Sequence, residues 1–339
     1  MKIAVRTLLP ALALLAFMLP LGGCSCGFDC NNDDDDDTNP ARLTLGFSDS
    51  LPEDLRQVVI EVDSITLSRS GVEDVVIETF TIPELDLVDA DTFQVDLLEY
   101  QGVSQLIVIE DLELIPGFYS AVSIAIVTGD VNKSYVQEDD DSLKAIAIGS
   151  SIRGLPGIEL SSGDQPFTVE FGLAQALQYQ ASSETYLLTT NGVRIENNLT
   201  AAKLSGSVDS ALFDTVSPCS EKTDPEKGNR VYLYNELNLL EENLADVFTS
   251  QSTTTPPSNA VAPFAVASMA QDSLTGNWNY SFGYVPAGSY TIAFSCNTAA
   301  DAAVEYNGLV IPLPIDQKYE ITLTEGQSGT CNLAEDASC

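Results

Sequence analysis

Apolar and polar residues alternate with a period of two along most of the chain after residue 41. Leu43, Leu45 and Phe47 each stand between more polar neighbours, and residues 58–67 form a long run rich in β-branched side chains. Such alternation is typical of a β-strand with one buried face. Further runs of this kind, separated by turn residues, occupy positions 75–80, 93–98, 119–127, 144–148, 167–171 and 186–195. The pattern predicts a mainly β fold.

A second series of strand-like runs begins near residue 203. Residues 249–263 are rich in Ser, Thr and Pro and are too polar for a core, whereas residues 235–247 are compatible with a helix. We therefore predict two antiparallel β-sandwich domains in tandem, at 42–202 and 203–339, with few short helices. The runs of the second series lie at 203–208, 231–234, 277–284, 290–295, 319–323 and 330–333; the other short helical candidates are 51–56 and 173–179, and residues 103–111 are ambiguous.

The first residues have a different pattern. Lys2 and Arg6 precede an apolar run over residues 8–21 that contains Pro10 and Pro20. A membrane-spanning helix needs about 20 apolar residues, so this shorter and interrupted run favours a secretory signal peptide.

The run ends in Leu21-Gly22-Gly23-Cys24, which resembles the lipobox of bacterial lipoproteins. The resemblance implies that residues 1–23 are removed and that Cys24 is acylated, and several acyl chains on one residue give a stable membrane anchor. Ser25 follows in place of Asp. By similarity to enterobacterial sorting signals, this residue indicates the outer membrane of a Gram-negative cell, with the protein facing the periplasm or the cell surface.

Residues 24–41 include five consecutive aspartates at positions 33–37. A block of like charges repels itself and stays extended, so we predict an acidic flexible tether between the lipid and the first domain. A calcium site in this run is disfavoured because it lacks the turns and the glycine that calcium loops use.

The chain has 50 acidic and 14 basic residues, a formal net charge of −36, and no histidine. Such a charge repels nucleic acid, so we expect no nucleic-acid partner. The absence of histidine excludes Ser-His-Asp and Cys-His catalysis and histidine metal ligation. No Ser-x-x-Lys motif follows the signal peptide, and the chain has no phosphate-binding glycine motif.

Six cysteines remain if Cys24 is acylated, and an even number in an exported chain indicates disulfides. Six cysteines allow 15 pairings. We favour disulfides over a zinc site, because the cysteine spacings are irregular for zinc. Among the possible disulfides, we favour pairs that are close in sequence or that lie in the same domain. The expected pairs are Cys219 with Cys296, Cys331 with Cys339, and Cys26 with Cys30.

Two acidic clusters are candidates for weak calcium binding. The first fails as an EF-hand, because counting from Asp89 places Gln94 where Gly is needed and Tyr100 where Glu is needed. A calcium site of another kind is kept as the alternative to surface loops, and we expect no other cofactor. The clusters are Asp86, Asp89, Asp91 and Asp96, and Glu138, Asp139, Asp140 and Asp141.

Trp278 and Tyr280 alternate along one strand with Phe282. Exposed Trp and Tyr residues on a β-sandwich stack on sugar rings in many binding modules, so both are candidate ligand residues. The pattern favours core packing, because these side chains share one face of the strand. Paired carboxylates could also hydrolyse glycosides, but with 50 acidic residues close pairs arise by chance.

The first domain resembles the bacterial domain-of-unknown-function family 4382 over roughly residues 42–200. The residues that carry the resemblance include the start at 43–50, the run 58–68 and Val95-Asp96-Leu97-Leu98. The resemblance implies a domain of exported lipoproteins without an established activity, so no site residue is carried over. The chain differs from the family at Ser48, where Thr is usual, and in the acidic loop 138–141.

A Pro/Gly turn precedes a tyrosine in both domains, at Pro116-Gly117-Phe118-Tyr119 and at Pro286-Ala287-Gly288-Ser289-Tyr290. The simplest interpretation is two ordinary hairpins. The element is also similar to one in transthyretin-like and carboxypeptidase-regulatory-like β-sandwiches, over about residues 204–334.

We expect a lipid-anchored, noncatalytic envelope protein that serves as a binding, adhesion or assembly module for an unidentified protein or glycan. The alternatives are a carbohydrate-active hydrolase that uses paired carboxylates and a calcium-stabilised structural spacer.

Overall fold

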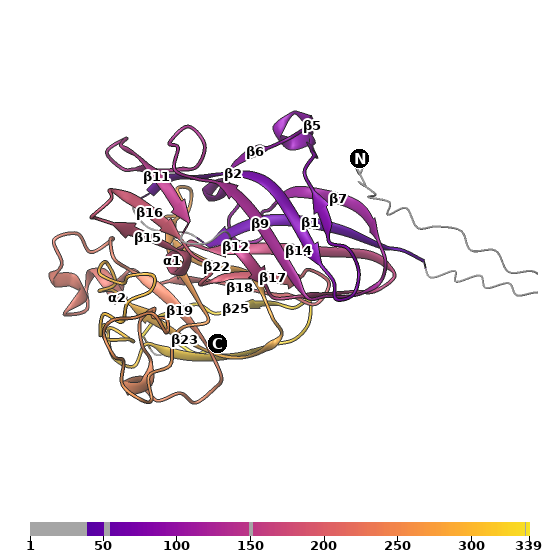
Figure 1. Ribbon diagram of the computed structural model, residues 1–339. Helices are drawn as coiled ribbons and strands as arrows, with labels where there is room; N and C mark the ends of the chain where they lie inside the picture. The colour runs from indigo at the N-terminus through magenta and orange to yellow at the C-terminus, as the bar shows by residue number, and fades with distance from the viewer. Residues whose placement is uncertain (1–38, 51–54, 149–151, 336) are drawn as a thin grey trace, which may run out of the picture.

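The computed structural model describes residues 39–50, 55–148, 152–335 and 337–339, and these residues form the mainly β fold that the sequence predicts. Figure 1 shows the sheets layered on one another. Within the described residues, no helix is both long and apolar enough to cross a membrane. The predicted signal peptide, Cys24 and most of the predicted tether lie outside them.

Two sheets enclose the first hydrophobic core. The first, sheet A, has the order β17 (Val193–Asn197), β14 (Gly163–Gly172), β1 (Ala41–Ser50) and β7 (Leu106–Leu114). The second has the order β12 (Ile152–Leu155), β9 (Ala121–Val127), β2 (Leu55–Ser68), β10 (Tyr135–Glu138), β11 (Leu143–Ile148), β16 (Thr185–Leu188) and β15 (Leu177–Gln180), with β3 (Val75–Ile77) and β6 (Phe93–Asp96) on β2. Two short pairs complete this part, β8 (Gly117–Tyr119) with β13 (Ile158–Leu160), and β4 (Phe80–Ile82) with β5 (Leu87–Ala90).

Two further sheets enclose a second core. One has the order β21 (Ala270–Gln271), β22 (Trp278–Val285), β18 (Ala202–Val208) and β25 (Ser328–Thr330), and the other β20 (Ala265–Ser268), β19 (Arg230–Asn235), β23 (Gly288–Ser295) and β24 (Lys318–Leu323). We call the strands β1 to β17 the N-terminal unit and β18 to β25 the C-terminal unit.

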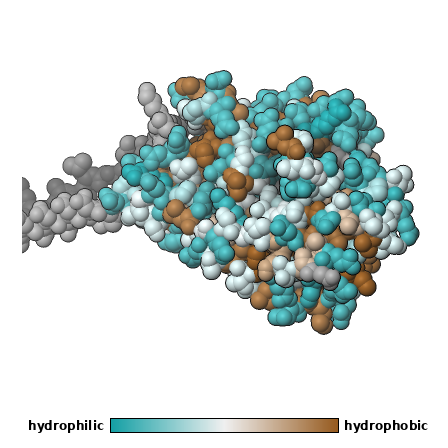
Figure 2. Space-filling model, turned by 180° about the vertical axis from the view of Figure 1, so that it is seen from behind, coloured by the Kyte–Doolittle hydropathy of each residue, from teal (hydrophilic) through white to brown (hydrophobic). Residues whose placement is uncertain are grey.

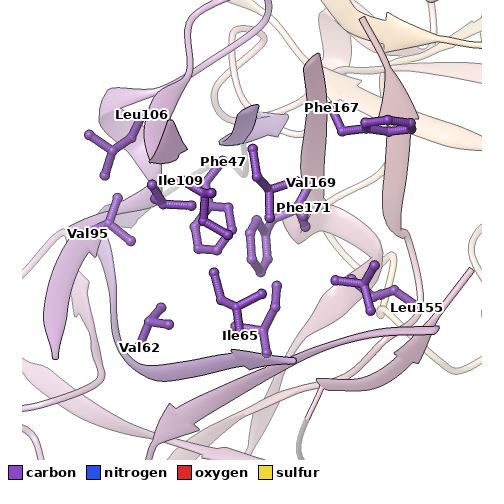
Figure 3. Close-up of a cluster of buried hydrophobic side chains, with 14 of the residues drawn as sticks. Phe47, Val62, Ile65, Val95, Leu106, Ile109, Leu155, Phe167, Val169 and Phe171 are labelled. Carbon is purple, nitrogen blue, oxygen red and sulfur yellow. The ribbon is translucent and has the colours of Figure 1, made fainter. Parts of the chain in front are cut away.

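The first core is built around Phe47 of β1, which is fully buried. Its ring lies 5.3 Å from that of Phe171 on β14, edge to face, and 6.2 Å from that of Phe93 on β6. Figure 3 shows Phe47, Val169 and Phe171 above Val62 and Ile65 of the opposite sheet. The period-two alternation therefore identified the residues that face the core.

Strand direction differs in part from the antiparallel expectation. The pairs β1–β14, β11–β16 and β18–β25 are parallel. Alternation shows which face of a strand is buried but not the direction of its neighbour, because side chains alternate in the same way in both arrangements.

Helix is confined to short segments in the described residues. The helix α1 (Leu173–Ala176) lies within the predicted segment 173–179, and α2 (Ala211–Asp214) follows β18. The helix-compatible segment 235–247 forms no α-helix and contains only a single turn of 3-10 helix at Glu241–Asn243. The ambiguous segment 103–111 contributes to strand β7. The other 3-10 turns are Pro83–Leu85, Leu97–Glu99 and Cys219–Glu221.

The two Pro/Gly turns connect sheets and are not hairpins. One leads from β7 of sheet A to β8 and β9, and the other leads from β22 to β23 in a different sheet. The hydroxyl of Tyr119 donates a hydrogen bond to the carbonyl of Ile115 (3.1 Å), and that of Tyr290 donates to the carbonyl of Pro286 (2.7 Å). In each crossover connection, the tyrosine hydroxyl is therefore hydrogen-bonded to a carbonyl four residues earlier in the chain. The hairpin interpretation is wrong for both turns.

The outward face of sheet A is polar but buried. Phe167, Val169 and Phe171 of β14 face the first core, so Thr168 and Glu170 point the other way, yet they are only 0% and 1% exposed. The C-terminal unit covers this face, as Figure 1 shows for β14, β17 and β22. The surface seen in Figure 2 is largely hydrophilic, with hydrophobic patches between polar residues.

Candidate functional site

A groove of about 680 Å³ lies where the two units meet. Its floor comes from β18 and β22, and its walls include residues of the β20–β21 segment and of the 101–102 loop of the N-terminal unit. None of the described residues that line it is charged, although 19% of the chain is charged. The lining residues are Gln101, Gly102, Ser205, Gly206, Ser207, Ala267, Ser268, Ala270, Asn277, Asn279, Tyr280, Ser281 and Asn332.

Strand pairing arranges the floor. The antiparallel register sets Ser205 opposite Ser281 and Ser207 opposite Asn279. Their neighbours Leu204 and Phe282 are buried in the second core, so alternation turns the serine and asparagine side chains to the opposite face. The result is a set of short hydroxyl and amide groups on one surface of the sheet.

Two glycines allow the units to approach each other at the edge of this floor. A Cβ on Gly283 of β22 would lie 1.6 Å from the carbonyl oxygen of Gly102, and one on Gly102 would lie 2.8 Å from Oγ of Ser281. Gly102 also has a φ of +62°, which L-residues rarely adopt. Nearby, the hydroxyl of Tyr284 donates to the carbonyl of Val103 at 3.0 Å. The N-terminal wall of the groove is thus held directly against β22.

Some polar groups of the groove are already bonded. Oδ1 of Asn332 accepts hydrogen bonds from the backbone N–H and the hydroxyl of Ser207, at 3.0 and 3.2 Å. Oγ of Ser268, by contrast, is buried and has no hydrogen-bond partner among the described residues. A buried hydroxyl without a partner is costly, so this position favours a ligand or water that can bond to it.

Beside the groove, the contact between units contains a cluster of ionisable side chains. Arg194 Nε lies 3.6 Å from a carboxylate oxygen of Glu196, and its guanidinium lies 4.8 Å above the ring of Phe264 in the C-terminal unit. Burial raises the pKa of Glu170 to about 7 against the opposing effect of Arg194, and burial likewise raises the pKa of Glu196 to about 7. Neither glutamate lines the groove.

The predicted aromatic residues lie mainly in the core. Tyr280 lines the groove but is only 3% exposed, and its hydroxyl donates to the carbonyl of Cys331 at 2.7 Å. The ring of Trp278 packs edge to face on Phe213 at 5.6 Å. Neither ring offers a free face in the groove, which agrees with the core packing that the pattern favoured.

The first acidic cluster is spread over a strand pair and a capped turn. Asp86 and Asp89 have positive φ angles on the turn and strand between β4 and β6. Oδ1 of Asp96 accepts hydrogen bonds from the backbone N–H groups of Val58 and Leu98. Asp96 therefore caps the 3-10 turn that follows it.

The second acidic cluster forms the β10–β11 turn, where its carboxylates already have partners. Asp141 pairs with Arg56, Asp140 accepts from the N–H of Ser142, and Asp139 lies 3.8 Å from Nζ of Lys227. In the described parts of the chain, no group of three or more Asp, Glu, Cys or His residues is arranged to hold a metal ion.

A second cavity, of about 520 Å³, lies between this acidic turn and the C-terminal unit. Tyr186 donates to Oε1 of Glu138 at 2.8 Å, and its ring lies 5.2 Å from that of Tyr179. Burial raises the pKa of Asp301, at the far wall, to about 6. Both carboxylate oxygens of Asp301 accept hydrogen bonds, one from the hydroxyl of Tyr232 and one from the N–H of Val247, so this carboxyl group holds loops together.

Two of the three expected disulfides are present. Cys219 is bonded to Cys296, with Cα atoms 5.7 Å apart, and Cys331 is bonded to Cys339. Cys26 and Cys30 lie outside the described residues, so their pairing stays a prediction.

Of the groove residues, the sequence pattern singled out only Tyr280 as a candidate ligand residue. Gln101, Asn279 and Ser281 look like ordinary outward-facing or turn residues in the sequence, because a period-two pattern marks them only as polar. The available signal was Ser205, Ser207, Asn279 and Ser281, a set of short uncharged side chains on two strands of a strongly acidic protein.

Comparison with solved structures gives low similarity throughout. A leucine-rich repeat protein from Bacteroides thetaiotaomicron is 10% identical, with a TM-score of 0.19, over 88% of this chain and 26% of that one. A candidate cell adhesion protein from Bacteroides fragilis is 8% identical, with a TM-score of 0.21, over 86% and 92% of the two chains. A fimbrial protein from Bacteroides ovatus is 8% identical, with a TM-score of 0.16, over 89% and 50%.

None of the curated proteins matches this sequence. A family model does match the N-terminal unit, over a range close to the one that the resemblance implied. Residues 40–190 match the family described as Domain of unknown function (DUF4382), so the N-terminal unit is similar to that family.

Proposed function

We propose that this protein is a noncatalytic binding module held at the cell envelope by lipid on Cys24, and that it binds its ligand in the groove between the two units. The observation that carries the proposal is the groove itself, which combines a suitable volume with converging hydroxyl and amide groups from both units. Adhesion or assembly in the envelope is the role that such a module would serve.

The chemistry of the groove supports binding without catalysis. General acid–base catalysis requires a titratable side chain within hydrogen-bond reach of the reacting atoms. Among the described residues that line the groove, only Tyr280 has a titratable side chain, and burial raises its pKa far above the usual range. The perturbed carboxyl groups of Glu170 and Glu196 are enclosed between the units instead.

The anchor is part of the same proposal. A lipid on Cys24 and a charged tether over residues 25–41 would hold the folded units clear of the membrane, and Ser25 favours the outer membrane. A net charge of −36 argues against nucleic acid as the partner.

Substituting the lipid-bearing cysteine tests the anchor. In a Gram-negative host, Cys24→Ala should stop acylation and move the protein from the membrane fraction to the soluble fraction, because no thiol remains to accept the lipid. Metabolic labelling with an alkyne fatty acid and fractionation measure both effects, with Cys26→Ala as the matched control. Equal labelling of the Cys24→Ala variant would contradict the proposal.

Blocking the groove tests the binding site. Asn279→Trp places a bulky side chain on its floor, so retention of the delipidated, purified protein on isolated cell envelopes should fall at least about tenfold, a loss of about 1.4 kcal/mol in binding free energy. The exposed residue Gln251, outside the groove, provides the control Gln251→Trp. Unchanged retention of Asn279→Trp, with its thermal unfolding unaltered, would place the binding site elsewhere.

A further inference from the structure

We infer that the ligand of the groove is a neutral, hydroxyl-rich glycan that is recognised by hydrogen bonds and not by ring stacking. This inference rests on the proposed function, since it names the class of ligand for the same groove.

The described lining of the groove is uncharged in a strongly acidic protein. The chain carries a formal net charge of −36, so an anionic polymer in the groove would be repelled by the protein as a whole. The described lining residues include no carboxylate that could form an ion pair with a cationic ligand. Discrimination between ligands commonly relies on charges that attract or repel, and this lining offers none. A neutral ligand is not repelled by the negative charge of the protein and needs no carboxylate in the lining.

The floor of the groove offers hydroxyl and amide groups for hydrogen bonds. Serine hydroxyls and asparagine or glutamine amides each both donate and accept, as sugar hydroxyls do. Ser205 and Asn279 are exposed, and no hydrogen bond from either side chain to another described residue is present. Their groups are therefore available to a ligand that lies along β18 and β22.

Ser268 contributes a buried hydroxyl to the groove. Its Oγ is buried in the wall of the groove without a hydrogen-bond partner among the described residues. An apolar ligand would leave this hydroxyl unsatisfied, whereas a hydroxyl-rich ligand can bond to it directly or through water.

The aromatic side chains Trp278 and Tyr280 are packed within the protein. Sugar-binding sites often place an aromatic ring against the pyranose. Here the ring of Trp278 packs on Phe213, and Tyr280 is buried with its hydroxyl bonded to Cys331. Recognition in this groove therefore depends on the polar floor, and the affinity of a single sugar unit is expected to be modest.

The test uses the delipidated protein on a glycan array, together with dextran, dextran sulfate and diethylaminoethyl-dextran, which share one backbone and differ in charge. The double variant Ser205→Ala/Asn279→Ala removes one exposed hydroxyl and one exposed amide of the floor. The matched control, Ser258→Ala/Gln251→Ala, removes one exposed hydroxyl and one exposed amide outside the groove. Circular dichroism and thermal unfolding check that both variants fold.

The inference predicts binding to one or more neutral glycans of the array, at least about tenfold weaker in the floor variant, unchanged in the control, and nearly independent of salt between about 50 and 500 mM. An array with no neutral glycan bound, binding confined to charged glycans, or neutral binding that the floor variant retains would each overturn it. If Asn279→Trp abolishes retention on envelopes while neutral glycans fail to bind, the proposed function stands and only the ligand class is wrong. If Asn279→Trp leaves retention unchanged, the proposed function itself fails.

Discussion

Replacing Cys219 and Cys296 together by alanine should lower the free energy of unfolding by about 4.5 kcal/mol, because their disulfide closes a chain segment with a sequence separation of 77 residues. The bond ties the 3-10 turn at Cys219–Glu221 to the end of strand β23, beside the second core. Without it, the unfolded chain regains the conformational entropy of a long open loop. Urea unfolding of the purified protein, analysed by linear extrapolation, measures the change.

The other disulfide is the internal control for this effect. Cys331 and Cys339 are separated by only 8 residues, so the same entropic argument predicts a loss of about 2.5 kcal/mol for their double alanine variant. The test is which of the two double variants loses more free energy of unfolding. Equal losses, or a larger loss from the Cys331–Cys339 pair, would show that loop entropy does not govern the contribution of these bonds.

Replacing Glu170 by glutamine should stabilise the protein at pH 8 and leave its stability at pH 5 nearly unchanged. Burial between the units raises the pKa of Glu170 to about 7 from its ordinary value of 4.5. Between these two values the folded protein holds a proton that the unfolded chain releases, so stability increases as the pH falls through 7. The substituted glutamine side chain would be neutral at every pH, like the protonated acid. The expected gain at pH 8 is on the order of 3 kcal/mol.

The sign of this effect distinguishes Glu170 from a partly exposed carboxylate that accepts hydrogen bonds. Glu305 accepts hydrogen bonds from Thr253 and Thr254, which lower its pKa to about 2. This carboxyl group is ionised in both the folded and the unfolded chain over most of the range from pH 5 to 8, so Glu305→Gln should hardly change the slope of stability with pH there. Urea unfolding of the wild type and the two variants at pH 5, 6, 7 and 8 measures the slopes. A wild-type slope that Glu170→Gln leaves intact would contradict the assignment to this residue.

The predictions for Glu170 and for the groove depend on the same structural fact, the close packing of the two units. An ionisable group is enclosed where the polar face of sheet A meets the C-terminal unit, and the groove lies at the border of this contact. Gln175 Nε2 donates to the carbonyl of Pro263 at 3.1 Å, and Asn191 Nδ2 donates to that of Ala303 at 2.9 Å. Motion of one unit against the other would alter the groove, so ligand binding and the stability of the contact are expected to be linked.

The amino-acid pattern was sufficient to predict the fold class, residues of the first core and two disulfide pairs. Alternation selected Leu43, Leu45 and Phe47 for the core, because a strand with one buried face must repeat with a period of two. It also placed the start of the second series of strands at residue 203, close to the first residue of β18. The number and spacing of the cysteines favoured the pairs Cys219–Cys296 and Cys331–Cys339.

The environment of the polar strand faces, by contrast, depends on the packing of distant segments. Thr168 and Glu170 have the sequence pattern of exposed residues but are enclosed by the C-terminal unit, whereas Ser205 and Asn279 share that pattern and line an open groove. The difference cannot be read from one strand, because it depends on which distant surface packs against it. Packing between distant segments also decides the parallel pairing of β1 with β14. The same holds for the two crossover connections in which Tyr119 and Tyr290 form hydrogen bonds. The local sequence determines the alternation of apolar and polar side chains along a strand. Long-range packing determines which strand it pairs with and which of its polar residues are exposed to solvent.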